Sequence, residues 1–241
     1  MMPVAILAGG LATRLRPLTE TIPKALIDIN GRPFLDYQLR LLSRKGVTDV
    51  VLCVGHCGEQ IREYAGDGSN FGLHIQYSFD GPRLLGTAGA IRRALPLLGT
   101  RFFVLYGDSY LHCDYGSVER HFLQSGKLGL MSVFLNEGNF DASNVEFARG
   151  RILKYNKVEP NPSMRHIDYG LGAFHHTALQ DVPLDKACDL VSVYQDLLQR
   201  GELAACEMQQ RFYEVGSTEG IAELSEFLSK SGIAQEPPEC A

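Results

Sequence analysis

The sequence has 241 residues, of which 45% are hydrophobic, and a formal net charge of -5. This length and composition suit one domain with a sizeable core, and the acidic balance argues against a general nucleic-acid binder, which usually has a basic excess. Small anionic ligands are still compatible with the sequence, because a local cluster of cations can bind them on an acidic protein.

The cysteine pattern and the first residues bear on the compartment. The six cysteines have no zinc-site spacing, so we expect reduced thiols, as is usual in a cytosolic protein. The start lacks the basic region of a signal peptide, and no apolar run reaches the roughly 20 residues of a membrane span. We therefore expect a cytoplasmic protein with no membrane span. The oligomeric state is left open, and a homo-oligomer is compatible with the sequence.

In the first half of the chain, short apolar runs alternate with helical patterns. The apolar runs predict strands at 3–8, 49–54, 73–78 and 101–109. The helical patterns predict helices at 33–46, 58–66 and 87–98, the last interrupted or ended near Pro96. This alternation predicts an α/β fold with a mostly parallel sheet and helices on both faces.

The second half is less regular. We expect strands at 128–135, 167–176, 203–208 and 211–216, and helices at 192–201 and 217–232. Residues 144–157 look like a hairpin with Arg149 and Gly150 near its turn, and Ser217 is the expected N-cap of the last helix. No linker or repeat is found, so residues 1–234 are predicted to form one domain and residues 235–241 a flexible tail.

The loop after the first strand, LAGGLATRLRPLTETIPKAL at residues 7–26, combines glycines with three cations. In open α/β sheets, ligands bind beyond the carboxyl ends of the strands, where this loop begins. We expect Gly9 and Gly10 to take positive φ and to let the backbone approach a ligand, while Arg14, Arg16 and Lys24 supply charge. The loop therefore predicts a phosphate cradle. It matches neither the dinucleotide-binding nor the P-loop glycine pattern, which disfavours a nicotinamide oxidoreductase.

This stretch resembles the signature of sugar-1-phosphate nucleotidyltransferases, L-A-G-G-x-G-T-R-L-x-P-L-T followed by P-K. The resemblance continues in order along the chain, in GTAGAIRRAL, LYGDS, KYNK and YEVGS. It implies a single-domain, Rossmann-like mixed sheet of the nucleotide-diphospho-sugar transferase type. One departure is Ala12, where the family usually has glycine. If this position needs positive φ, alanine costs about 1 kcal/mol there.

The implied reaction transfers a nucleoside monophosphate from a nucleoside triphosphate to a sugar 1-phosphate and releases pyrophosphate. A phosphate monoester is mostly dianionic at neutral pH because its second pKa is about 6, so no general base is required. Positioning and charge neutralisation then carry most of the catalysis, which suits a cation-rich loop and a carboxylate-held Mg²⁺. The expected partners are these two substrates, with no nucleic acid.

The resemblance assigns a role to each matching residue. The catalytic residues are Arg14, Lys24, Asp108 and Lys157. The Mg²⁺ ligands are Asp108 and Glu214, which stands where the family more often has aspartate. The nucleotide-binding residues are Leu7, Ala8, Gly9, Gly10, Thr13, Gln76, Gly86 and Thr87. The sugar-phosphate residues are Lys157, Asp168 and Gly170, with Asp168 accepting hydrogen bonds from sugar hydroxyls and Gly170 leaving room for the ring.

Several of these assignments have alternatives. Lys154 competes with Lys157 for the sugar phosphate, Arg16 is as well explained as a solvated side chain, and Gln76 as an outward strand residue. Within the family, residues 155–174 and 212–220 look most like D-glycero-α-D-manno-heptose 1-phosphate guanylyltransferases, which use GTP and serve surface polysaccharide synthesis. Residues 66–78 and 86–99 also resemble N-acetylmuramate 1-phosphate uridylyltransferases. A regulatory pseudoenzyme that binds a nucleotide sugar is an alternative of another class.

Overall fold

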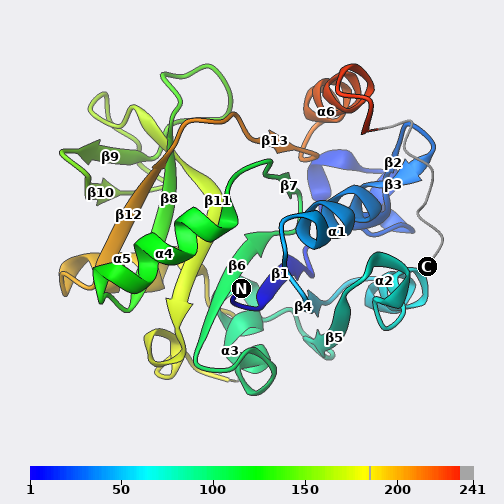
Figure 1. Cartoon of the computed structure of the whole chain (residues 1–241), viewed down its shortest axis with the longest axis horizontal. Helices are drawn as coiled ribbons and strands as arrows, with labels where there is room; N and C mark the ends of the chain where they lie inside the picture. Colours follow the sequence, from blue (N-terminus) through cyan, green and yellow to red (C-terminus); the bar gives the residue numbers. More distant parts are fainter. Residues whose placement is uncertain (185, 234–241) are drawn as a thin grey trace.

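The computed structural model describes residues 1–184 and 186–233, and its centre is a nine-stranded mixed sheet (Figure 1). Strand β1 (Val4–Ala8) lies between β4 (Asp49–Val54) and β6 (Arg101–Tyr106), and β5 (His74–Phe79) forms the edge next to β4. All of these pairings are parallel. The sheet agrees with the α/β fold class expected from the sequence, and these strands lie where the apolar runs predict them.

Helices cover both faces of the sheet because β1 is apolar on both sides. Its Val4 and Ile6 pack with α1 (Phe34–Arg44), α2 (Gly58–Ala65) and α4 (Tyr115–Ser125), whereas Ala5 packs with α3 (Gly86–Leu98) and α5 (Leu190–Gln199). Successive strand residues point to opposite faces, so one short apolar run joins two core layers.

Two predicted helical features differ from the structure. Helix α3 continues through Pro96 to Leu98. A proline removes one backbone hydrogen bond, which is tolerated here because only two helical residues follow it. Helix α4 is absent from the sequence expectations, although Asp114 caps it and Tyr115, Val118 and Phe122 form its buried stripe. The capping residue and this spacing of apolar residues could have predicted helix α4 from the sequence.

The second half extends the sheet with mixed strands. Strand β11 (His166–His175) is antiparallel to β6 and to β8 (Gly129–Leu135), and β12 (Leu203–Met208) runs parallel to β8. The expected hairpin is formed by β9 (Val145–Ala148) and β10 (Arg151–Tyr155). Its turn residues Arg149 and Gly150 have φ of 53° and 74°, as a tight hairpin turn requires.

Short elements complete the fold. The predicted strand 101–109 is split into β6 and β7 (Ser109–Tyr110), and only Tyr213–Glu214 of the predicted strand 211–216 forms a strand, β13. Strands β2 (Asp28–Ile29) and β3 (Arg32–Pro33) pair with each other. Helix α6 (Thr218–Lys230) is capped by Ser217, as expected. The 3-10 helices are Thr13–Leu15, Leu18–Glu20, Lys24–Leu26, Ser69–Phe71 and His176–Leu179.

The described residues also bear on the cysteine and membrane expectations. All five cysteines within them are free thiols. Among residues 1–184 and 186–233, no helix has the length and apolar character needed to cross a membrane. The expected flexible tail at 235–241 lies outside the described residues.

Candidate active site

A cavity of about 680 Å³ opens at the carboxyl ends of the central strands, within the usual size range of a ligand site. Most residues assigned from the sequence line it: Leu7, Ala8, Gly9, Gly10, Arg14, Lys24, Gly86, Thr87, Asp108, Lys157, Asp168 and Glu214. Thr13, Gln76 and Gly170 are not among its described lining residues, and neither are the alternatives Arg16 and Lys154. The fold therefore gathers distant parts of the sequence around one cavity.

The two glycines of the loop do not have the backbone conformation that we expected. Neither Gly9 nor Gly10 is among the residues with positive φ. A Cβ on Gly9 would lie 3.1 Å from the backbone nitrogen of Gly55, so glycine is needed there for close packing. A Cβ on Gly10 would meet no described atom within 4 Å. Gly9 thus keeps two loops together, and Gly10 leaves space at the cavity.

The positive φ in this loop belongs to Ala12, with φ of 48° and ψ of 46°. The left-handed backbone is held by its carbonyl, which accepts hydrogen bonds from the amide of Leu15 at 3.1 Å and the hydroxyl of Thr19 at 2.8 Å. The position where the family usually has glycine therefore does require the conformation that glycine favours.

One cation of the loop, Lys24, pairs with Asp108, and a second, Arg14, lies near Lys24. The ammonium of Lys24 lies 2.8 Å from Oδ2 of Asp108, and both side chains are partly buried. A Cβ placed on Gly216 would be 3.5 Å from the Arg14 guanidinium and 3.9 Å from the Lys24 ammonium. Arg14 and Lys24 thus lie beside the same glycine. Arg14 and Arg16 are both exposed, but Arg14 lines the cavity and Arg16 is not among its lining residues. This arrangement concentrates positive charge where a polyphosphate could enter.

A second carboxylate reaches Asp108 from the far end of the chain. Strand β13 pairs with β7, and the amide of Val215 donates to the carbonyl of Asp108 at 2.9 Å. Burial, and after it the charge of Asp108, raises the pKa of the adjacent Glu214 to about 8, while Lys24 opposes the shift. Two carboxylates therefore share a site with too little positive charge for both.

This donor set fits Mg²⁺. The ion commonly takes one or two protein carboxylates and completes its shell with water and substrate phosphates. Within residues 1–184 and 186–233, no cluster of three or more acidic, histidine or cysteine side chains suited to a metal is found. Asp108 and Glu214 would therefore hold the ion only together with a phosphate ligand, which matches a substrate-bound metal rather than a structural one.

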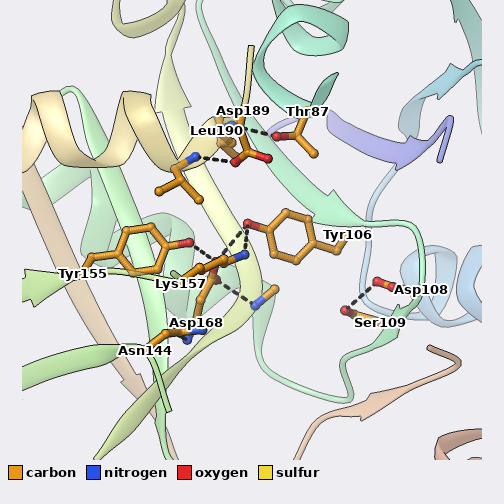
Figure 2. A network of polar contacts seen from close by, with 12 residues as sticks. Thr87, Tyr106, Asp108, Ser109, Asn144, Tyr155, Lys157, Asp168, Asp189 and Leu190 are labelled. Atoms are coloured by element: carbon orange, nitrogen blue, oxygen red, sulfur yellow. Dashed lines mark hydrogen bonds and ion pairs between the residues drawn. The ribbon is translucent and has the colours of Figure 1, made fainter. Parts of the chain in front are cut away.

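The other end of the cavity carries Lys157 and Asp168 (Figure 2). Asp168 Oδ2 accepts hydrogen bonds from the Tyr106 hydroxyl at 2.9 Å and the Tyr155 hydroxyl at 3.1 Å. It also lies 3.5 Å from the Lys157 ammonium, while Oδ1 accepts from the amide of Gly170. Both oxygens thus accept hydrogen bonds within the protein, while Asp168 also lines the cavity, and its expected role toward sugar hydroxyls stays a prediction.

Gly170 and Thr87 also have structural contacts that the sequence did not indicate. Gly170 has φ of 92°, and a Cβ there would lie 2.9 Å from the Ser109 hydroxyl, so glycine is required by the backbone and by β7 rather than by a sugar ring. The Thr87 hydroxyl accepts a hydrogen bond from the amide of Leu190 at 2.7 Å. Thr87 therefore ties helix α3 to helix α5 at the rim of the cavity.

Sequence reasoning missed several lining residues: Asp80, Tyr106, Asp141 and Asn144. Asp80 directly follows β5, and Tyr106 ends β6. The rule that ligands bind at the carboxyl ends of parallel strands could have found both. Asp141 and Asn144 lie between β8 and β9, and no local pattern marks them.

Comparisons with known proteins agree with this geometry. The family model described as Nucleotidyl transferase matches residues 4–141. N-acetylmuramate alpha-1-phosphate uridylyltransferase of Neisseria meningitidis is 43% identical over 115 residues, which are 47% of this chain and 50% of the relative. The chain thus spans about half the length of that relative in the match.

Other matches extend over nearly the whole chain. D-glycero-alpha-D-manno-heptose 1-phosphate guanylyltransferase of Campylobacter jejuni is 28% identical over 219 residues, which are 90% of this chain and 96% of the relative. Among solved structures, HddC from Yersinia pseudotuberculosis complexed with GMP-PN has a TM-score of 0.78 at 23% identity and covers 95% of this chain and 100% of its own. That structure supports the fold alone. The chain belongs to the Nucleotidyl transferase family.

Proposed function

We propose that this chain transfers a nucleoside monophosphate from a nucleoside triphosphate to a sugar 1-phosphate. An oxygen of the sugar phosphate forms a bond to the α-phosphorus, the bond from that phosphorus to the bridging oxygen breaks, and pyrophosphate leaves with the electron pair. The observation that carries the proposal is that the Lys24–Asp108 pair and Lys157 line the same cavity. Two anions need this kind of double cationic site to approach each other.

The order of the strands in the sheet supports an arrangement of the two substrates along the cavity. Lys157 follows β10 and lies by Asp168 of β11, Asp108 follows β6, and Asp80 follows β5. Strands β1 and β4 lie between β6 and β5, so at about 4.8 Å per strand the distance from β6 to β5 is roughly 14 Å. The sugar phosphate would then bind beside Lys157 and react near Asp108. The nucleobase of the triphosphate would lie toward Asp80.

The side chains supply the charge that the reaction requires. Arg14 and Lys24 bind the triphosphate and stabilise the negative charge that grows on the departing pyrophosphate. Lys157 neutralises the incoming phosphate and directs its oxygen. Mg²⁺ held by Asp108 and Glu214 would add Lewis-acid polarisation of the phosphoryl oxygens. We propose this Mg²⁺ dependence on the carboxylate pair described above.

Asp80 supports GTP as the nucleotide. Its side chain is nearly buried at the base end of the cavity, and one oxygen, Oδ2, accepts a hydrogen bond from the amide of Leu85 at 3.0 Å. No ion pair of Asp80 is found in the described part of the chain. Guanine offers a carboxylate two adjacent N–H donors, whereas uracil offers one N–H between two carbonyl oxygens. A buried carboxylate therefore favours guanine.

For the sugar, we propose D-glycero-α-D-manno-heptose 1-phosphate, a precursor for surface polysaccharide. The similarity to the Campylobacter guanylyltransferase extends through the second half, which contributes Lys157 and Asp168. A second candidate is uridylyl transfer to N-acetylmuramate 1-phosphate, favoured by the 43% identity to the Neisseria relative over 115 residues. A regulatory pseudoenzyme is disfavoured, because Arg14, Lys24, Asp108 and Lys157 are all present at the cavity.

The test is a matrix of nucleoside triphosphates against sugar 1-phosphates, scored by pyrophosphate release with Mg²⁺ and with a chelator. We expect Mg²⁺-dependent turnover that is fastest with GTP and the heptose 1-phosphate. Faster turnover with UTP and N-acetylmuramate 1-phosphate would support the second candidate. Tight binding of a nucleotide sugar without any turnover would contradict the enzymatic proposal.

A single substitution tests the nucleotide choice separately. Asp80→Asn keeps an acceptor for the Leu85 amide but presents an amide donor to the base. We expect the preference for GTP over UTP, as the ratio of kcat/KM values, to fall about tenfold or more, because one bidentate pair contributes about 1–3 kcal/mol of base discrimination. Asp67→Asn, at an exposed turn aspartate, is the matched control. An unchanged ratio in Asp80→Asn would exclude Asp80 from base recognition.

A further inference from the structure

Asp168 is a buried carboxylate, and both of its oxygens accept hydrogen bonds from groups of the protein. Its side chain is only 3% exposed. Oδ2 accepts from the hydroxyls of Tyr106 and Tyr155, and Oδ1 accepts from the amide of Gly170. The amide of Asp168 itself donates to Oδ1 of Asn144 at 3.0 Å. A buried charge is costly unless it is paired, and here the cationic partner is Lys157.

Lys157 differs from Asp168 in its exposure. Its side chain is 39% exposed and lines the cavity, while its ammonium lies 3.5 Å from Asp168 Oδ2 and donates to the Tyr106 hydroxyl at 3.4 Å. The ammonium also lies 4.8 Å from the centre of the Tyr106 ring and 5.9 Å from that of Tyr155, within cation–π range. Figure 2 shows both phenol hydroxyls directed at Asp168 beside Lys157.

We propose that Asp168, Tyr106 and Tyr155 form a seat for Lys157, and that they are positioning residues for the reaction. In this role Asp168 acts through Lys157 and does not itself bind the sugar hydroxyls. The inference rests on the proposed function, since it is the incoming sugar phosphate that Lys157 would meet. It gives a specific reason for the buried charge: the seat fixes a long, flexible side chain that would otherwise sample many rotamers.

The seat is also tied to the reacting end of the cavity. Tyr106 ends β6, Lys157 follows β10 and Asp168 lies on β11, so separate strands converge on one carboxylate oxygen. Tyr106 is two residues before Asp108 on a continuous stretch of backbone. The seat therefore sets the position of the Lys157 ammonium relative to the Asp108 carboxylate, and with it the separation of the two substrate phosphates.

The first test measures the chemical reactivity of the Lys157 ammonium in the absence of any substrate. Limited reductive methylation of the full-length protein, followed by peptide mass spectrometry, gives the labelling of Lys157 relative to the exposed Lys154 as an internal reference. A nitrogen held by a carboxylate and a phenol reacts slowly. We expect the ratio to rise about tenfold in Asp168→Asn, which removes the ion pair, and severalfold in Tyr106→Phe, which removes a long hydrogen bond to an uncharged acceptor.

The matched control is Tyr169→Phe. Tyr169 neighbours Asp168 on β11 but packs on the opposite face of the sheet, and its buried hydroxyl has no hydrogen-bond partner in the described chain. This variant should leave the labelling ratio unchanged. Thermal melts confirm that each variant is folded, and Tyr155→Phe, which keeps the ring, supplies a second variant if Asp168→Asn does not fold.

The second test uses the steady-state constants. We expect the KM for the sugar 1-phosphate to rise about tenfold in Asp168→Asn and severalfold in Tyr106→Phe, with the KM for the nucleoside triphosphate within twofold of wild type. Unchanged labelling together with an unchanged sugar-phosphate KM in folded variants would overturn the seat. If the wild-type protein released no pyrophosphate with any substrate pair, the proposed function would fail, and the labelling ratio would still decide whether the seat holds Lys157.

Discussion

The two halves of the molecule build their parts of the cavity in different ways. In the first half, the loop from Leu7 to Lys24 brings glycines and cations to the cavity from one continuous stretch. In the second half, Lys157, Asp168 and Glu214 come from three separate elements. A parallel sheet places consecutive loops at one edge, whereas mixed strands and long connections bring single residues in from a distance.

Asp108 is where the two halves meet, so its removal should have the largest effect. It pairs with Lys24 of the first half, and its carbonyl accepts from the amide of Val215 of the second half. Asp108→Asn keeps this backbone bond but loses the charge. We expect kcat to fall about a thousandfold, because charge stabilisation at the reacting phosphate is lost. Pyrophosphate release measures the change.

The control is Asp196→Asn, which removes an exposed carboxylate paired with Arg200. It should leave kcat unchanged. A decrease of less than tenfold in Asp108→Asn would mean that the charge of Asp108 does not serve the reaction and that the reaction centre lies elsewhere in the cavity.

Glu214 is the second-half residue with the clearest dependence on pH. Its pKa is raised from 4.5 to about 8, mainly by burial and then by Asp108, so folding favours its protonated form. Between these two values the folded state binds more protons than the unfolded state, and stability is lost as pH rises through that window. Between pH 5 and pH 9 we expect this group to contribute a loss of about 4 kcal/mol.

Urea unfolding between pH 5 and pH 9, with a chelator present, measures this contribution. Glu214→Gln cannot ionise and should be more stable than wild type near pH 8 and above, with little difference near pH 5. Glu63→Gln, at an exposed position of α2, is the control. Parallel stability curves for wild type and Glu214→Gln would show that the carboxylate is not held in this environment.

Lys24 of the first half allows a test of whether its ammonium competes with a metal ion for Asp108. Its ammonium lies 2.8 Å from Asp108 and so competes with any metal for that carboxylate. In Lys24→Met, without nucleotide, we expect Mn²⁺ to bind about tenfold more tightly, since the competing ion pair is gone. Calorimetric titration with Mn²⁺ measures it.

Arg14→Met is the matched control for Lys24→Met. It removes the same charge from the same neighbourhood, beside Gly216, without removing the partner of Asp108. An equal gain in Mn²⁺ affinity in both variants would indicate a general effect of charge and contradict direct competition by Lys24.

The difference between the halves also explains how far the sequence could predict the structure. Strands β1, β4, β5 and β6 and the cation loop are marked by local patterns, apolar runs ending at glycine or charged residues. The role of Asp168 was not accessible in this way. It depends on Tyr106 and Tyr155, which lie 62 and 13 residues away and meet it only through the antiparallel register of the second half. Asp141 and Asn144 have no local signal either.

Ala12 gives the smallest expected effect, and one confined to the first half. Its φ of 48° is unfavourable for an L-residue by about 1–2 kcal/mol, and glycine would relieve this strain. Glycine also adds about 0.4–1 kcal/mol of conformational freedom to the unfolded chain, which offsets part of the gain. We therefore expect Ala12→Gly to raise the free energy of unfolding by about 0.5 kcal/mol, a difference that replicate urea titrations can resolve.

The control is Ala148→Gly, on strand β9 with a negative φ, which should instead be destabilising. If both substitutions destabilised the protein equally, the carbonyl bonds from Leu15 and Thr19 would not be holding Ala12 in the left-handed region in solution, and the loop would bind its phosphates from a different backbone conformation.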